Sequence, residues 1–166
     1  TSPQQITYQG KVSEHPLIKL LIPGIVKMDT ISFNGRFDSE SKDSAFVFIL
    51  SAPFLHYQDN ILFRSRVNIV DINQQLQFNL GADTIQSAGK RFYESSAIGY
   101  ATHDSISIDV NTRNSNDKNR FMLGADITFH GDEYGFHLKN KLVLNDQDWV
   151  VAPENTIIYS SKGIMA

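Results

Sequence analysis

The chain has 166 residues, of which 41% are apolar and 20% charged, so it is long and apolar enough to form one folded domain. Its net charge is 15 − 18 = −3 and no basic stripe is visible, which argues against a nucleic-acid-binding protein. There is no cysteine, which excludes disulfides and thiolate metal sites. The longest apolar run, residues 45–50, is far shorter than the roughly 20 residues that cross a bilayer, so we expect no transmembrane segment.

The first expected element is a short helix at about residues 15–22. Pro16 suits a first helical turn, and Leu17, Leu20 and Leu21 fall on one helical face. Pro23 followed by Gly24 stops the helix. We expect a single domain over residues 1–166, excised from a larger protein because no signal peptide precedes it.

The rest of the chain alternates apolar and polar residues with a period of two. The alternation is clearest at 76–82, 106–110, 121–129 and 134–138. It indicates strands of about 9 to 13 residues, each with one apolar and one polar face. Pro53 predicts a bulge, an edge or a break inside the apolar stretch around it.

Polar turn signals separate these strands every 10 to 17 residues or so. They lie at 56–60, 71–73, 102–105, 114–117, 130–133 and 145–148. Short turns between long alternating strands are typical of an antiparallel meander. We therefore predict an all-β fold, in which the sheet either closes into a sandwich or barrel or stays open with one apolar face.

No recognisable catalytic constellation is present. The sequence lacks a Gly-x-Ser-x-Gly elbow, a phosphate-binding glycine loop and a His-Glu-x-x-His motif. His130 and His137 flank Asp132 and Glu133, and two surface histidines beside a polar turn explain this spacing better than a metal site does. We predict no enzyme activity, no cofactor, no metal site and no catalytic residue.

Several segments resemble the AsmA-like part of bacterial TamB (translocation and assembly module) proteins, in the form found in Bacteroidetes. The shorter matches are LLIPG at 20–24, NGRFDS at 34–39, LGADTI at 80–85 and NRFMLG at 119–124. The most specific is the ordered string LVLN at 142–145, WVV at 149–151, NTI at 155–157 and GI at 163–164. Together these segments fall between Pro16 and Ala166, which is most of the chain.

This resemblance implies a β-taco, a long curved open sheet with an apolar interior, in a periplasmic protein anchored to the inner membrane in its full-length form. It also implies transport of phospholipid between the membranes and support of outer-membrane assembly beside a barrel partner. The family supplies no catalytic residues.

An open apolar groove in such a sheet would shelter the acyl chains of phospholipid or a similar ligand, because burying each CH₂ is worth about 0.8 kcal/mol. The apolar positions of the clear alternating runs are the candidate groove-lining residues: Leu76, Phe78, Leu80, Ile106, Ile108, Val110, Leu123, Ile127, Phe129, Phe136 and Leu138. Two alternatives stay open: a scaffold that binds a partner strand by β-augmentation, and a carbohydrate-binding β-sandwich. Trp149 is expected to be a buried anchor.

Overall fold

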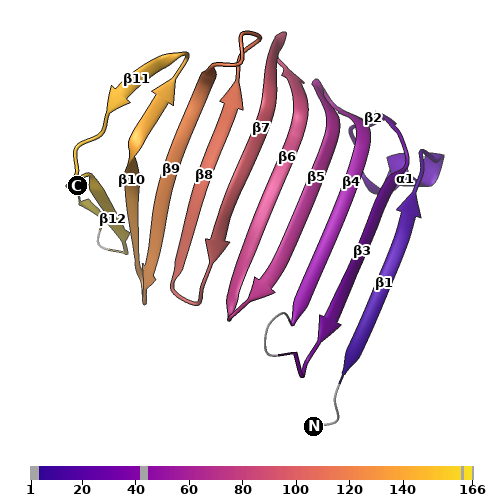
Figure 1. The fold of residues 1–166 in the computed structure, drawn as a ribbon, viewed down its shortest axis with the longest axis horizontal. Coiled ribbons are helices and arrows are strands. Elements are labelled where there is room, and N and C mark those ends of the chain that lie inside the picture. The colour runs from indigo at the N-terminus through magenta and orange to yellow at the C-terminus, as the bar shows by residue number, and fades with distance from the viewer. Residues whose placement is uncertain (1–3, 42–44, 162, 166) are drawn as a thin grey trace.

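The fold is one antiparallel β-sheet that does not close on itself (Figure 1). It comes from a computed structural model that describes residues 4–41, 45–161 and 163–165. The predicted all-β class and the open alternative are confirmed, whereas the closed sandwich or barrel is not what these residues form. Residues 1–3, 42–44, 162 and 166, which the expected domain included, lie outside the described residues.

Thirteen strands and one helix make up the described chain. The elements are, in order, β1 (Gln5–Val12), α1 (Pro16–Leu21), β2 (Ile25–Met28), β3 (Ile31–Asp38), β4 (Phe46–Tyr57), β5 (Asn60–Ile72), β6 (Gln75–Ser87), β7 (Lys90–Ala101), β8 (Ser105–Arg113), β9 (Asn119–His130), β10 (Glu133–Leu144), β11 (Gln147–Val150), β12 (Thr156–Ser160) and β13 (Gly163–Met165).

The sheet follows the chain almost strand by strand, in the order β1-β3-β4-β5-β6-β7-β8-β9-β10-β12-β13. Two short strands leave this path: β2 pairs with β4 beyond the end of β3, and β11 pairs with β10 beyond β12. The central strands β4 to β10 have 9 to 13 residues. Ten inter-strand steps of about 4.8 Å make the sheet roughly 48 Å wide.

The predicted helix is present as α1, with Pro16 in its first turn. The side chain of His15 caps it by accepting a hydrogen bond from Leu17 N, at 3.2 Å. Lys19 ties it to the sheet because its Nζ lies 2.8 Å from Glu14 Oε1 and 2.9 Å from Val26 O. The hydrogen bond from Lys19, followed by one from the backbone N–H of Met28, lowers the pKa of the Glu14 carboxyl.

Tight turns with left-handed backbone join several pairs of neighbouring strands. Asn73 and Gln74 both have positive φ, as do Asn145 and Asp146, which is the pattern of two-residue type I′ hairpins. The sequence prediction missed a third turn of this kind between β6 and β7, where Ala88 and Gly89 have φ of 48° and 74°. Gly89 is the local signal that marks this turn.

In the part of the chain that the structure describes, no second layer covers the sheet. Among the described residues the buried apolar side chains are Met28, Ala52, Ala82, Ala125 and Val143, and no large side chain is fully buried. The expectation that Trp149 is a buried anchor is wrong, because Trp149 is 54% exposed. It lies in β11, a four-residue strand that pairs only with β10, so no neighbouring strand shields it on the other side.

Asn155 joins the two short strands that share the outer edge of β10. Strand β12 pairs with β10 up to His137 and β11 pairs from Lys141, which leaves the backbone of Leu138 between them. The side chain of Asn155 fills this place: its Oδ1 accepts from Leu138 N at 2.8 Å and its Nδ2 donates to Leu138 O at 3.0 Å. One amide side chain therefore replaces a backbone pair in the ladder.

We predict that Asn155→Ala lowers the free energy of unfolding by about 1–3 kcal/mol, because both backbone groups of Leu138 lose this partner. Urea denaturation followed by circular dichroism measures it. The control is Asn79→Ala, which removes an exposed side chain from the central strand β6 and should change the free energy of unfolding by no more than about 0.5 kcal/mol. Equal losses in the two variants would contradict the role given to Asn155.

Candidate functional site

One face of the sheet carries a continuous apolar surface, here called the apolar face and defined as the face that bears Leu76, Phe78 and Leu80. Residues paired across antiparallel strands share a face, so the strand registers assign the neighbours. Three rows cross the sheet in this way, each containing one of these three residues. They are Phe33–Leu50–Val67–Leu80–Ala97–Val110–Leu123–Leu142, Phe48–Ile69–Phe78–Gly99–Ile108–Ala125–Leu138 and Leu76–Ala101–Ile106–Ile127–Phe136–Ile157, the last of which begins beside Asp71 near the end of β5.

The registers bring all eleven residues predicted to line a groove to this face. Ten of them lie in the three rows, and Phe129 lies two residues beyond Ile127, opposite Tyr134. Phe129 and Tyr134 contact each other edge to face, with ring centroids 5.7 Å apart. The apolar face also includes Phe48 and Leu50, while Ile49 between them lies on the opposite, polar face.

Aromatic rings fill the places where glycines interrupt the apolar face. A Cβ on Gly99 would collide with the ring of Phe78 and with the backbone of β8. In the same way the rings of Phe33 and Tyr8 occupy the space above Gly10 and Gly35. These glycines therefore keep the surface continuous, because the neighbouring ring lies flat across the strand.

A row of interruptions crosses strands β4 to β7. The ladders skip Pro53 in β4, Arg64 in β5, Asp83 in β6 and Glu94 in β7, which lie opposite one another in the registers. Arg64 and Glu94 have φ of 49° and 44°, a left-handed backbone that is rare inside strands. Pro53 has no N–H to donate, so its place in a central strand coincides with a gap in pairing.

The interruptions reverse the alternation of side chains along each strand. Leu62 and Val67, five residues apart in β5, line the same hollow on the apolar face, and so do Leu80 and Ile85 in β6. In a regular strand an odd separation places two side chains on opposite faces. Both halves of these strands thus present aliphatic residues to the apolar face, although the apolar residues fall on odd positions in one half and on even positions in the other.

The apolar face has a hollow of about 310 Å³ where this row crosses it. Its floor consists of small residues from successive strands: Ser65, Ala82 and Ser95, with Thr112 of β8 beside them. Larger aliphatic side chains surround the floor, among them Leu80 and Val110 of the predicted set. The sequence prediction missed the floor residues, because small serine, alanine and threonine side chains do not stand out in a pattern of alternating apolar and polar residues.

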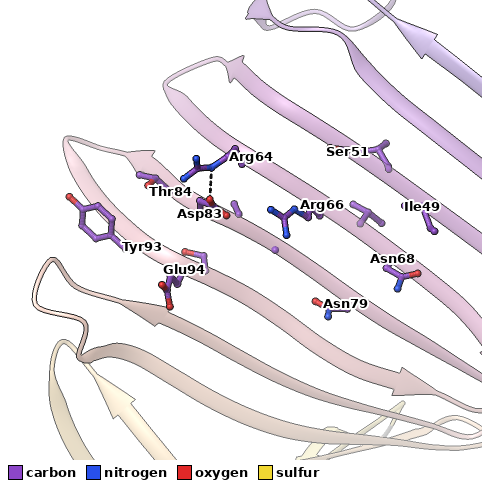
Figure 2. Close-up of a pocket in the computed structure, with 15 residues that line it drawn as sticks. Ile49, Ser51, Arg64, Arg66, Asn68, Asn79, Asp83, Thr84, Tyr93 and Glu94 are labelled. Atoms are coloured by element: carbon purple, nitrogen blue, oxygen red, sulfur yellow. Dashed lines mark ion pairs between the residues drawn. The ribbon is translucent and has the colours of Figure 1, made fainter.

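The polar face carries a wider hollow on the reverse of the same row, of about 800 Å³ (Figure 2). Arg64 forms an ion pair with Asp83 there, and the amides of Asn68 and Asn79 lie opposite each other on β5 and β6. The consecutive residues Tyr93 and Glu94 both line it, as the reversed alternation requires. Charges and amides thus line this hollow together with Ile49, whereas aliphatic side chains make up most of the lining of the hollow on the apolar face.

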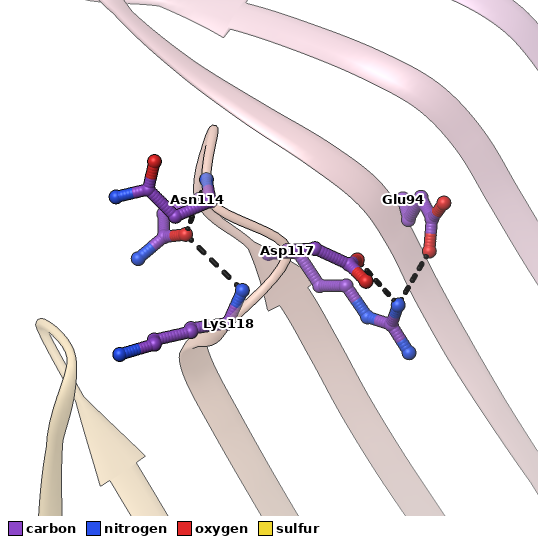
Figure 3. A network of polar contacts seen from close by, with 6 residues as sticks. Glu94, Asn114, Asp117 and Lys118 are labelled. Carbon is purple, nitrogen blue, oxygen red and sulfur yellow. Dashed lines mark hydrogen bonds and ion pairs between the residues drawn. The ribbon is translucent and has the colours of Figure 1, made fainter.

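Ion pairs continue from this row to the loop between β8 and β9 (Figure 3). Nη1 of Arg113 lies 2.6 Å from Asp117 Oδ1 and 3.0 Å from Glu94 Oε2. The hydrogen bond to Asp117 and the charges of both carboxylates raise the pKa of Arg113. Asn114 Oδ1 accepts from the backbone N–H groups of Asn116 and Lys118, which fixes the loop that presents Asp117.

Within the described residues, no three histidine, aspartate or glutamate side chains gather to hold a metal ion. His137 instead places Nδ1 at 3.1 Å from the carbonyl oxygen of Asn155. In the described part of the chain no helix has the length and apolarity needed to cross a membrane.

No protein-family model, no curated protein and no solved structure matches the chain. The resemblance to TamB proteins therefore stays a prediction that rests on the sequence segments alone.

Proposed function

We propose that this chain is a cell-envelope module of the TamB type that shelters the acyl chains of phospholipid on its apolar face. The observation that carries the proposal is the continuous apolar surface over β3 to β10, which no described element covers. Soluble monomers rarely leave contiguous apolar patches larger than a few hundred Å² in water, and larger ones mark sites for apolar ligands or partners.

The single-layer architecture suits transport along a surface. Backbone N–H and C=O groups are paired within the ladders, so an acyl chain that lies on the sheet meets almost only side-chain carbon. Apolar contact is non-directional, so a lipid moves along the face without breaking specific hydrogen bonds. The head group stays in water, since the face is open to solvent. We place this function in the periplasm, with no catalytic step.

An observation at the sheet edge favours a second candidate function, β-augmentation by an outer-membrane barrel protein. Ser39 N donates to Gln4 O at 3.0 Å, which shows that the even-numbered residues of this edge direct their backbone groups toward β3. The odd-numbered residues of β1, from Gln5 to Lys11, consequently direct theirs outward, where no described strand pairs with them. An edge with free donors and acceptors accepts a further strand.

For lipid sheltering we predict that Leu80→Asp reduces co-purified phospholipid by roughly tenfold or more, since an unpaired carboxylate against acyl chains costs over about 1.4 kcal/mol. The matched control is Ile98→Asp, because Ile98 lies on the polar face of the adjacent strand and is similarly exposed, at 49% against 37% for Leu80. Native mass spectrometry with organic extraction measures the lipid. If both folded variants keep as much lipid as the wild type, the assignment of the apolar face is wrong.

For β-augmentation we predict that Gln9→Pro abolishes photo-crosslinking of a barrel protein to a benzophenone side chain placed at Thr7. Proline removes an outward N–H and leaves the bonds from β1 to β3 intact. Gln9→Ala, which keeps the N–H, should crosslink like the wild type, and both variants should retain lipid. Undiminished crosslinking in Gln9→Pro would exclude pairing at this edge.

A further inference from the structure

Arg120 places a cation on the apolar face. It is the second residue of β9, just after the loop that joins β8 to β9 at the upper edge of the sheet in Figure 1. The pairing of β8 with β9 changes register between Thr112 and Arg113, which leaves Arg120 as the extra residue of a bulge. Because of this bulge, Arg120 and the next residue, Phe121, lie on the same face and contact each other.

Two phenylalanine rings hold the guanidinium of Arg120 on this face. Phe92 belongs to the apolar face because it pairs with Ile85, which lines the hollow there. Phe121 pairs with Thr112, which lines the same hollow. Cζ of Arg120 lies 5.4 Å from the ring centroid of Phe92 and 5.9 Å from that of Phe121. Both distances are within the range of cation–π attraction.

Arg120 has no anionic partner among the described residues. None of their carboxylates lies within ion-pair distance of it, and Asp117 pairs with Arg113 instead. The backbone N–H of Asp146 donates to the carbonyl oxygen of Arg120 at 3.0 Å, but the Asp146 carboxylate accepts from the side chain of Asn114. Nε of Arg120 is buried and has no hydrogen-bond partner.

The aromatic contacts leave the hydrogen-bonding capacity of Arg120 unused. A guanidinium stacks through its flat faces, whereas its five N–H groups point outward in its plane. A cation that is partly removed from water and lacks an anion costs free energy, so native proteins usually pair such groups. Protein atoms cover Nε, but the two Nη groups are neither buried nor paired in the described structure. An oxyanion bound to them would keep its remaining oxygens in water.

We propose that the Nη groups of Arg120 bind the phosphate of a phospholipid, at the edge of the face that shelters its acyl chains. The inference rests on the proposed function and adds a recognition group to it, since apolar contact alone does not distinguish a phospholipid from a neutral lipid. A guanidinium donates two parallel hydrogen bonds to a phosphate. The rings of Phe92 and Phe121 fix the guanidinium beforehand, which reduces the entropy lost on binding.

Two lipids with the same chains test the phosphate contact: dihexanoyl phosphatidylglycerol and dihexanoylglycerol, which lacks the phosphate. NMR titration of the protein with each measures the two affinities. The wild type should bind the phosphate-bearing lipid about tenfold or more tightly than the other, because hydrogen bonds to a charged group are strong. Arg120→Met keeps an unbranched side chain against the rings without the charge, and should bind the two lipids equally.

The matched control is Arg91→Met, which removes the same charge at the neighbour of Phe92 in β7. Arg91 pairs with Gln86 and Phe92 with Ile85, so Arg91 lies on the polar face. It is exposed and has no ion pair among the described residues. Arg91→Met should therefore keep the preference for the phosphate-bearing lipid. Loss of the preference in both variants would indicate a general effect of net charge and overturn the site.

Thermal unfolding separates recognition from a structural role. Removing an unpaired cation should leave the melting temperature of the free Arg120→Met variant unchanged or raise it. A lower melting temperature with an unchanged lipid preference would mean that Arg120 only packs against the rings. Titration with inorganic phosphate distinguishes a head-group site from a site for free anions. An affinity equal to that for dihexanoyl phosphatidylglycerol would overturn the lipid assignment, and a much weaker one supports it.

The outcomes also separate this site from the wider function. If the wild type binds both lipids equally while Leu80→Asp still loses phospholipid, Arg120 is not a phosphate site but the apolar face still shelters lipid. If the wild type binds neither lipid and retains no phospholipid on purification, both proposals fail.

Discussion

Strand pairing alone places the side chains of this protein, because no second layer of described residues packs against the sheet. In most domains a buried core both stabilises the fold and fixes which side chains meet. Here the large side chains of the apolar face keep contact with solvent, and their order depends on the registers of long hairpins. The apolar surface is therefore left available for a ligand, at the expense of stability that a covered core would supply.

The interruptions in pairing across β4 to β7 create a hollow in an otherwise uniform apolar surface. A regular ladder would continue the rows of large aliphatic residues from one end of the strands to the other. The left-handed residues Arg64 and Glu94 reverse the alternation instead, so that small residues form a floor between two aliphatic walls on one face. On the other face the same row gathers ion pairs, such as that of Arg64 with Asp83.

The period of two was enough to predict the all-β class, the long strands and the shared face of all eleven candidate residues, because alternation reports directly on which side of a strand a residue lies. The face on which a side chain lies was not predictable where the alternation reverses. Leu80 and Ile85 are five residues apart, so simple alternation places them on opposite faces, yet both line the hollow on the apolar face. Only the interrupted pairing with the adjoining strands shows why. The exposure of Trp149 was missed for a related reason, since it depends on how few strands flank β11.

The most direct test of the account uses methyl NMR of the protein mixed with a stearic acid that carries a nitroxide spin label. The nitroxide broadens signals near it, so the experiment reports which face the acyl chain touches. The account predicts strong broadening for the methyls of Leu76, Leu80 and Leu123 on the apolar face and little for those of Ile49 and Ile98 on the polar face. Equal broadening on both faces, or none on either, would contradict the claim that the apolar face shelters acyl chains.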